Sequence, residues 1–493
     1  MSNVFSFFES HGINNMLIFA IPFSGVLLIA IINQLINKRK PNGCSCPIAP
    51  SSYLQNIKEM SKEQFPLFLI EMANKSASNT YFLRFPIPSG GLYVVGDPPT
   101  MRAILQDSES DKPAFMYESI NTIVGNSNIA SYSTKHPMLK AVRKCVLKSF
   151  SAREIMRMND VCDKHVNKWI ENDLEHYITE GKSFDPSEEM VKLTFDLIME
   201  SAFEYTNESG ERDIFMENLE KSGEEFDTKE GGNPFRAYCT PFLKDRREAF
   251  KASKDCRKFV QKVIDTYRMN PNKSEQNTII KLILNNKEIK TEKERVANIF
   301  TMMIAGFDTT GFTISSTLIL LAKHPHVAEK LRKELLQMEP EDWSKSPYLR
   351  CVLQESKRLL PVAALGGGRT TSKDFIVKRS TDDLNFTIPK GVHVIFSYIA
   401  SFRDPATFND PESFYPERWE TENVTTKMKD ALIPFSLGSR SCVGQRLAVS
   451  ELYSTIPKLV TKYDFEIEVE GELYCNITFK YKGSRLRATR AKN

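Results

Sequence analysis

The sequence has almost no excess of charge of either sign. Its 493 residues include 66 Lys and Arg against 62 Asp and Glu, which leaves a formal net charge of +4. An excess this small argues against nucleic acid as a partner. The chain also lacks internal repeats, low-complexity tracts and any linker that would separate a second core. With 41% apolar and 26% charged residues, its composition excludes a disordered, collagen-like or polytopic membrane protein.

The nine cysteines lack the spacing of a zinc site. They are scattered from Cys44 to Cys475, and the one tight pair, Cys44 and Cys46, has no second pair at zinc-ligand spacing downstream. An odd number of scattered cysteines predicts free thiols in a reducing compartment. At most one or two of them are expected to carry chemistry.

The N-terminus departs from this average composition. Residues 16–32 contain no charge and are about long enough to cross a bilayer core. No Lys or Arg precedes them and a basic run follows at 38–40, so the positive-inside rule predicts a cytosolic body. A cleaved signal peptide would need a basic first region and a small-residue cleavage site, which are missing. We expect a transmembrane anchor over 1–37, an extended basic and proline-rich connector over 38–50, and one large domain over 51–493.

Apolar periodicity predicts a mostly α domain with small β-sheets, an α+β fold. Apolar residues at helical spacing predict helices over about 137–181, 186–206, 245–268, 291–323, 346–360 and 445–463. Alternating or β-rich runs predict strands within 81–97 and 374–398, and a hairpin from residue 465 onward.

The most specific motif runs from Phe435 to Ala448 and reads FSLGSRSCVGQRLA. Gly438 and Gly444 permit tight turns that bring the backbone close to a flat ligand. Cys442 directly precedes a predicted helix, whose N-terminal N–H groups favour a thiolate, a soft metal ligand. A lone cysteine is more often an inert buried thiol, but the surrounding glycines and arginine favour a ligand.

This segment resembles the haem-binding loop of the cytochrome P450 family, F-x-x-G-x-R-x-C-x-G-x-x-x-A, at every fixed position. The resemblance implies a P450 fold that binds haem b, with Cys442 as the axial ligand of the iron. It also implies that Arg440 pairs with a haem propionate and that Phe435 packs near the sulfur and limits the access of water.

A second motif, AGFDTT, lies in the middle of the predicted helix over 291–323. An acid followed by two threonines, with a glycine beside them, is poor helix-interior chemistry, and such exceptions mark functional sites. The resemblance implies that Gly306 makes room for dioxygen and that Asp308 and Thr309 deliver protons. Outside such a motif, Asp308 would be interpreted as an ordinary paired surface acid.

Glu355 and Arg358 are three residues apart on one predicted helix face. Such a pair alone is usually a solvated ion pair. The downstream segment FYPERW contains Arg418 and resembles the P-E-R-F segment of the same family. The resemblance implies a buried structural triad of the three residues that fixes the cysteine loop.

Two further arginines match propionate-binding positions of the family. Arg143 lies in the predicted helix that starts near residue 137, although the tryptophan common four residues before it is Leu139 here. Arg369 follows Arg358 by eleven residues.

A basic stripe follows the same helix, formed by Lys140, Lys144 and Lys148. Such a stripe is often only a solvated face. The resemblance implies that it docks an acidic NADPH-cytochrome reductase.

Taken together, the resemblance implies a membrane-anchored haem-thiolate monooxygenase of the endoplasmic reticulum. A reductase would supply electrons from NADPH, and one oxygen atom of O2 would enter a small lipophilic substrate, as a hydroxylation or a stepwise methyl oxidation. Specialised (secondary) metabolite biosynthesis is the expected setting. Two alternatives remain: a haem-thiolate isomerase or dehydratase that needs no reductase, and a non-catalytic haem sensor. The intact acid–alcohol pair favours the monooxygenase.

The family's substrate-binding regions carry apolar residues in this chain, which predicts a largely apolar pocket. Its expected lining is Phe115, Phe242, Phe307, Val362 and Leu365. Nearby basic residues, Arg236 and Arg246 among them, leave two alternatives: they hold a substrate carboxylate, or they face lipid headgroups or water.

Overall fold

The structure is a computed structural model and describes residues 46–491 except 61, 86–89, 209, 231–233, 271–275 and 379–384. The predicted anchor over 1–37 lies outside the described residues, as does the connector up to residue 45. The boundaries between anchor, connector and domain therefore stay predictions.

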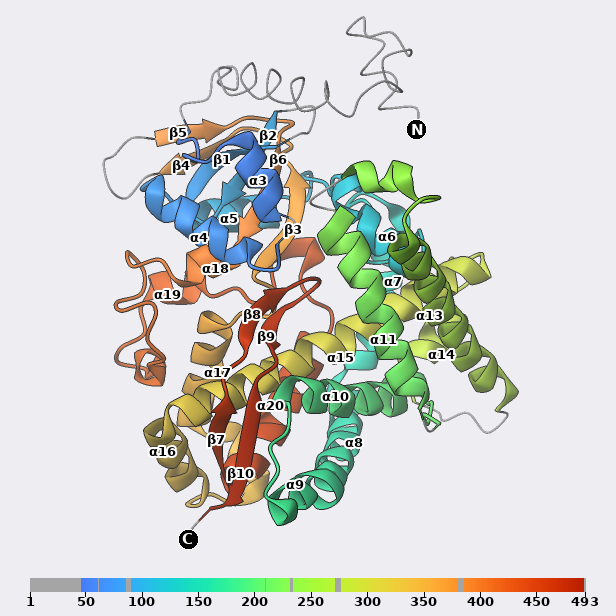
Figure 1. Ribbon diagram of the computed structural model, residues 1–493, viewed down its shortest axis with the longest axis vertical. Coiled ribbons are helices and arrows are strands. Elements are labelled where there is room, and N and C mark those ends of the chain that lie inside the picture. The colour runs from blue at the N-terminus through green and yellow to red at the C-terminus, as the bar shows by residue number, and fades with distance from the viewer. Residues whose placement is uncertain are drawn as a thin grey trace, which may run out of the picture.

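The long helix α15 (Glu292–Lys323) crosses the centre of the molecule (Figure 1). A capping box starts it, in which the Thr291 side chain accepts from the Glu294 backbone N–H and the Glu294 side chain accepts from that of Thr291. Within the described part of the chain, α15 is the one helix long and apolar enough to cross a membrane. However, 78% of its apolar window is buried in the protein, as expected for a core helix.

Other helices surround α15 on several sides (Figure 1). The longer ones are α8 (Ala152–Trp169), α10 (Pro186–Phe203), α11 (Glu211–Gly223), α13 (Lys244–Met269), α16 (Pro325–Leu335), α17 (Pro347–Leu359) and α20 (Gln445–Val460). The shorter ones are α3 (Tyr53–Met60), α4 (Phe65–Lys75), α5 (Pro98–Gln106), α6 (Glu118–Val124), α7 (Pro137–Val146), α9 (Glu175–Glu180), α14 (Ile279–Leu284), α18 (Tyr398–Phe402) and α19 (Thr426–Ala431).

The predicted helix over 137–181 is wrong in one respect, because the chain breaks it into several pieces. After α7 comes a 3₁₀ turn, Leu147–Phe150, and Ser151 then adopts an extended conformation with ψ of 158° before α8 begins. The apolar periodicity continues across this break, so it does not reveal the break itself.

The β part consists of small sheets, as predicted. A four-stranded sheet has the order β1 (Thr80–Arg84), β2 (Gly91–Val95), β6 (His393–Ser397) and β3 (Leu365–Thr370), with β2 and β6 parallel. Antiparallel pairs are formed by β4 (Phe375–Lys378) with β5 (Asn385–Ile388), β7 (Tyr463–Val469) with β10 (Arg485–Arg490), and β8 (Glu472–Cys475) with β9 (Phe479–Lys482). The predicted C-terminal hairpin is thus β7 with β10, and the β8–β9 hairpin is inserted between them.

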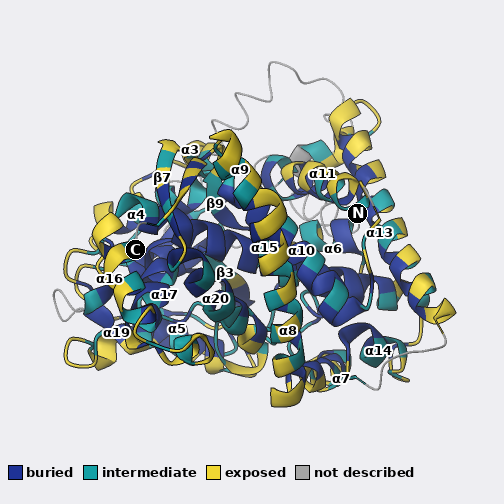
Figure 2. Cartoon of the chain, turned by 90° about the horizontal axis from the view of Figure 1, so that it is seen from below, coloured by how far each residue is buried: buried dark blue, intermediate teal, exposed yellow. Residues whose placement is uncertain are grey.

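Two large apolar clusters contact α15 from its two halves. Ile314 and Leu318 belong to a cluster with Leu349 of α17 and Ile456 of α20. The N-terminal half, including Phe300, belongs to a second cluster with residues of α10, α11 and α13. Buried residues gather in the interior and exposed ones along the outer helices (Figure 2). The predicted fold class, mostly α with small sheets, is confirmed.

Candidate haem-thiolate site

The loop before α20 is fixed by its backbone. Cys442 N–H donates to the Phe435 carbonyl at 2.9 Å, which closes the loop. Gly438 has a φ of 71°, in the left-handed region, and a Cβ added to it would lie 2.4 Å from the Leu105 carbonyl oxygen at the end of α5. Both facts require glycine at this position.

The geometry around Gly444 does not require glycine. Its φ of −88° is open to any residue, so the turn does not require glycine. An added Cβ would have a single neighbour within 4 Å, the Cys442 sulfur at 4.0 Å. A contact at this distance is ordinary van der Waals packing, so the tight turn expected of Gly444 stays a prediction.

Cys442 is one of two cysteines in the described part of the chain whose side chains are exposed, the other being Cys239. Although the sulfur is accessible, desolvation by the surrounding protein raises the pKa of the Cys442 thiol, while the backbone N–H groups of Gly444 and Gln445 and the charge of Arg143 lower it. The described residues contain no group of three or more His, Cys, Asp or Glu side chains that could hold a metal ion. A metal bound here would therefore have the Cys442 sulfur as its protein ligand and would need a further ligand of its own, such as a porphyrin.

Three predicted arginines gather beside this loop. Arg440 donates to the carbonyl groups of Ile129, Ala130 and Tyr132 at 3.2, 3.2 and 2.6 Å. Arg369, which is 3% exposed, donates to Gly368 O at 3.0 Å. Burial lowers the pKa of Arg440 to about 10, and the charge of Arg369 adds to this effect. In the described part of the chain, Arg143, Arg369 and Arg440 make no ion pair with a carboxylate, so a buried anion would be stabilised here.

The sequence analysis missed a fourth cation, Lys112. Its ammonium donates to Ala130 O and lies 4.0 Å from the centroid of the Tyr117 ring. Burial and the charges of Arg440 and Arg369 place the pKa of Lys112 well below its ordinary value. The nearby acid, Asp111, is engaged by the Ser133 hydroxyl and the Thr134 N–H. Lys112 belongs to no motif, and nothing in the spacing of the sequence links it to the three arginines.

The two polar side chains of the acid–alcohol motif on α15, Asp308 and Thr309, have different hydrogen-bond partners. Thr309 Oγ1 donates to Ala305 O at 2.9 Å, which is the preceding turn of the helix. Asp308 Oδ2 accepts from Thr478 Oγ1, in the β8–β9 turn, at 2.8 Å. Burial raises the pKa of Asp308, and the positive charge of Lys480 acts against this rise.

Gly306 has a packing role that the sequence analysis did not foresee. A Cβ added to it would lie 2.7 Å from Ile198 Cγ1, so the missing side chain lets α10 approach α15. The neighbouring Ala305 is exposed. The close packing of α10 on α15 thus explains why residue 306 is a glycine. The role of Gly306 toward dioxygen stays a prediction.

Glu355, Arg358 and Arg418 lie together and are buried. Arg358 Nε donates to Glu355 Oε2 and Arg418 Nε to Glu355 Oε1, each at 2.9 Å. Trp419 Nε1 and the Tyr415 N–H also donate to this carboxylate, at 2.8 and 3.0 Å. The remaining guanidinium N–H groups donate to carbonyls of Phe402, Asn409, Asp410, Pro411 and Ser413. These contacts tie α17 to the segment 402–419, which precedes the cysteine loop, and not to the loop itself.

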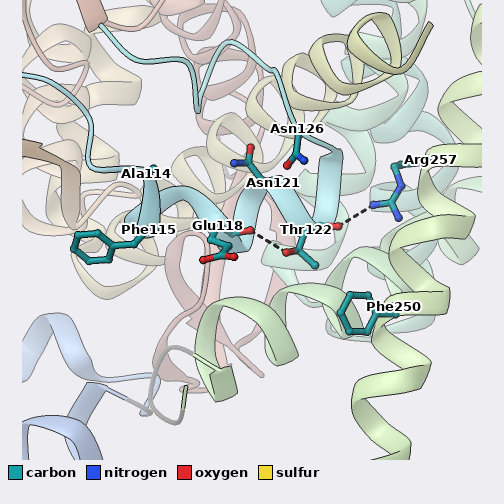
Figure 3. Close-up of a pocket in the computed structure, with 8 residues that line it drawn as sticks. All are labelled: Ala114, Phe115, Glu118, Asn121, Thr122, Asn126, Phe250 and Arg257. Carbon is teal, nitrogen blue, oxygen red and sulfur yellow. Dashed lines mark hydrogen bonds between the residues drawn. The ribbon is translucent and has the colours of Figure 1, made fainter. Parts of the chain in front are cut away.

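The five residues predicted to line the substrate pocket lie in different surroundings. Phe115 lines an open cleft of about 680 Å³ between α6 and α13, which Figure 3 shows. The cleft is lined by Ala114, Phe115, Glu118, Asn121, Thr122, Asn126, Phe250 and Arg257. Phe242 is 86% exposed in the loop before α13, and its place in the substrate pocket stays a prediction. Phe307 is 1% exposed and packs on Phe195 with ring centroids 5.3 Å apart, inside the α10–α15 contact. Val362 and Leu365 are half-buried.

The arginines considered for a substrate carboxylate are already paired. Arg236 Nη2 lies 2.7 Å from Glu225 Oε2, and Arg246 Nη1 lies 3.0 Å from Glu225 Oε1. Arg246 also pairs with Glu230 at 2.8 Å. These ion pairs remove the basis for either arginine as a carboxylate anchor.

The basic stripe is exposed along its length. Lys140 and Lys144 lie on α7, and Lys148 lies on the 3₁₀ turn that follows it. Within the described residues, none of the three makes an ion pair. The same helix carries Arg143, whose Nη1 donates to Ser441 O at 2.8 Å. The stripe therefore lies on the helix that contacts the cysteine loop.

The chain belongs to the cytochrome P450 family, whose sequence profile matches residues 48–479. A rat (Rattus norvegicus) protein, "Sterol 26-hydroxylase, mitochondrial", is 32% identical over 189 residues, 36% of this chain and 34% of that protein. The Caenorhabditis elegans cytochrome P450 CYP13A5 is 32% identical over 208 residues, 41% of this chain and 38% of that protein. The matches therefore span little more than a third of the length of these curated relatives.

The fold has a solved counterpart in the crystal structure of the cytochrome P450DA heme domain. The two superpose with a TM-score of 0.73 over 91% of this chain and 97% of that one, at 21% identity. The location in the endoplasmic reticulum gains no support from the rat relative, whose name places it in mitochondria.

Proposed function

We propose that this protein is a haem-thiolate monooxygenase that inserts one oxygen atom of O2 into a small, largely lipophilic substrate. One observation carries the proposal. An accessible sulfur at the N-terminus of α20 lies on a loop next to four cations that come from separate segments of the chain and have no carboxylate partner among the described residues. A flat metal complex with two carboxylates has the chemistry that this arrangement requires.

Haem b fits these residues. Cys442 would hold the iron, and Arg143, Arg369, Arg440 and Lys112 would hold the propionates. Bound haem supplies the reduction of dioxygen and the transfer of one of its atoms to the substrate, while the other leaves as water.

The protein's own part in this reaction is the supply of protons and the exclusion of water. Asp308 holds a proton more readily than an exposed acid, because burial raises its pKa. Thr309 Oγ1 lies on the adjacent position of α15 and can exchange its hydrogen bond to Ala305 O for one to a reacting group. Phe435 is proposed to shield the sulfur from water.

Electrons are proposed to come from NADPH through a reductase with an acidic surface. Its docking site would be the exposed stripe of Lys140, Lys144 and Lys148, on the helix whose Arg143 contacts the cysteine loop. The predicted N-terminal anchor would hold both proteins at a membrane of the endoplasmic reticulum.

The alternative functions make a different prediction about electrons. An isomerase or dehydratase would turn over without a reductase, and a haem sensor would bind haem without turnover. The acid–alcohol pair on α15 favours the monooxygenase, because neither alternative requires protons to be delivered to dioxygen.

A labelled-oxygen experiment tests the proposal. Ligands that shift the haem spin state of the full chain are incubated with NADPH, a reductase and ¹⁸O-labelled dioxygen. We expect a product that carries one labelled oxygen atom and forms only when the reductase is present. A product formed without reductase, or without label, would overturn the monooxygenase assignment.

A further inference from the structure

Thr478 lies in the turn between β8 and β9 and is 4% exposed. Its hydroxyl donates to Asp308 Oδ2 at 2.8 Å, a contact between residues 170 positions apart in the sequence. Figure 1 shows the β8–β9 hairpin next to α15, the helix that carries the acid–alcohol motif. The acid of the motif is thus held by a hydroxyl from a separate element near the C-terminus.

The position of this turn is fixed by backbone hydrogen bonds. The strands β8 and β9 pair as an antiparallel hairpin. Within the turn, the Asn476 N–H donates to the Thr478 carbonyl at 3.3 Å. Directly after it, the Phe479 N–H donates to the carbonyl of Val362, before β3, at 2.9 Å. These bonds place Thr478 without any contribution from its hydroxyl.

One oxygen of the Asp308 carboxyl is engaged and the other is not. Among the residues that the structure describes, Asp308 Oδ1 has no hydrogen-bond partner and the carboxyl makes no ion pair. A protonated carboxyl has a single O–H, and its carbonyl oxygen is the better acceptor. The donor Thr478 on Oδ2 therefore favours the proton on Oδ1.

Lys480 of β9 adds a positive charge on the same side of α15. Its ammonium lies 4.1 Å from the ring centroid of Phe312, which follows Asp308 by one helical turn. Burial raises the pKa of Asp308, and the charge of Lys480 and the hydrogen bond from Thr478 both oppose this rise. The hairpin therefore influences both the orientation of the acid and its proton affinity.

We infer that Thr478 is a positioning residue for proton delivery: its hydroxyl holds Asp308 Oδ2, so that the proton on Oδ1 is directed to the dioxygen site. This inference rests on the proposed monooxygenase function and deepens it, because that function assigns no role to the β8–β9 hairpin. A contact that served only packing would depend on the shape of Thr478. Positioning depends on its O–H, because a donor distinguishes the two carboxyl oxygens. Valine has the shape of threonine without this donor, and serine has the donor with less bulk.

Carbon monoxide is the probe, and the sample is the reduced holoprotein of the full chain. Carbon monoxide occupies the coordination position of dioxygen, and its infrared stretch responds to charges and hydrogen-bond donors beside it. Asp308→Ala should shift this stretch. Thr478→Val should shift it by at least half as much, whereas Thr478→Ser should match wild type. The control Thr407→Val removes another hydrogen bond from a threonine to an aspartate, Asp404, at 3.0 Å and should have no effect.

A double-variant cycle shows whether Thr478 acts through Asp308. In the Asp308→Ala background, Thr478→Val should produce no further shift, because the carboxyl that it positions is absent. A full additional shift in that background, or an unshifted stretch in the single variant Thr478→Val, would overturn the inference. So would a Thr478→Ser variant that shifts as much as Thr478→Val.

The remaining outcomes separate this inference from the function on which it rests. Thr478→Ala is a second variant without the donor and should shift the stretch as Thr478→Val does. Loss of haem from both, with retention in Thr478→Ser, would show that the hydroxyl maintains the fold, and would contradict a positioning role. An effect of Asp308→Ala without one of Thr478→Val refutes this inference alone. Absence of a thiolate-type spectrum in folded wild type refutes the proposed function, and a silent Asp308→Ala refutes the role of Asp308 in it.

Discussion

Arg143 Nη1 donates to the carbonyl oxygen of Ser441 at 2.8 Å, directly before the cysteine that is proposed to hold the haem iron. The same helix, α7, presents Lys140 and Lys144 to solvent. A single short helix therefore connects the surface proposed for electron entry with the backbone of the proposed ligand loop. The basic stripe is therefore connected to the cysteine loop through one helix and one hydrogen bond.

Replacement of the stripe tests whether the reductase docks at this helix. The triple variant Lys140→Ala, Lys144→Ala and Lys148→Ala should slow electron transfer from an acidic reductase about tenfold or more at low salt, because attraction between the two surfaces is lost. The difference from wild type should shrink as salt is added. Stopped-flow reduction under carbon monoxide measures the rate. The matched control replaces Lys251, Lys254 and Lys258, which are exposed on α13. Equal slowing in the two triple variants would contradict docking at α7.

Lys112 is predicted to contribute to haem retention. Lys112→Met removes one of four cations that surround the proposed propionate positions, so the variant should lose bound haem at lower temperature or during dialysis. The control is Lys135→Met, because Lys135 is exposed and pairs with Glu109 at 2.7 Å. Haem content per protein measures the effect. Full haem retention in Lys112→Met would show that the Lys112 ammonium does not contribute to haem binding.

Thr309 is predicted to control the coupling of electrons to product. Thr309→Ala should keep haem and bind ligand, but release most reducing equivalents as hydrogen peroxide, because the hydroxyl that moves protons is missing. The control is Thr313→Ala. Thr313 lies one turn after Thr309 on α15, and its hydroxyl donates to the Thr309 carbonyl oxygen at 2.7 Å. Peroxide formed per NADPH consumed is the measurement. A Thr309→Ala variant that couples as well as wild type would refute the proton-delivery role.

The buried triad is predicted to act on stability. Glu355→Gln leaves Arg358 and Arg418 buried without a negative partner, which should lower the free energy of unfolding by about 3–5 kcal/mol. Glu329→Gln removes an exposed acid that pairs with Lys333 on α16 and should have no measurable effect. Thermal or denaturant unfolding of the haem-bound protein measures both. A small effect of Glu355→Gln would mean that the segment 402–419 is held by other contacts.

Glu451 is predicted to make stability depend on pH. It lies on α20, 1% exposed, and its Oε2 has no hydrogen-bond partner among the described residues. Burial raises its pKa from 4.5 to about 8, while a hydrogen bond from Thr310 opposes this rise. Folding therefore takes up a proton between these two pKa values, and the contribution of Glu451 to stability falls as pH rises across this window. Glu451→Gln should gain melting temperature relative to wild type from pH 5 to pH 9. A constant difference between the two proteins would contradict the raised pKa.

The sequence predicted those parts of the site that depend on neighbouring residues. The cysteine loop and the pair of Glu355 with Arg358 each lie within a short sequence motif. One local hydrogen bond closes the loop, and helix spacing brings Glu355 and Arg358 together. Arg418 follows because its segment is also a motif. The fold class followed from long stretches of helical periodicity.

The remainder depends on contacts that no local pattern records. Lys112 joins the arginines only because four separate segments fold against each other. Gly306 proved to be a packing position because Ile198 of α10 lies opposite it, 2.7 Å from where a Cβ would be. Phe242 and Phe307 have the apolar character of pocket residues, but one is exposed and the other is part of the core. Apolar character alone does not distinguish a pocket residue from an exposed residue or a core residue.

The carbon monoxide difference spectrum of the reduced full-length protein tests the central claim most directly. Wild type should show the spectrum of a thiolate-bound haem, and Cys442→Ser should lose it. Cys239→Ser, which removes the other exposed cysteine of the described part, should leave it unchanged. Folded wild-type protein that binds haem without a thiolate-type spectrum, or a Cys442→Ser variant that retains the spectrum, would contradict the account.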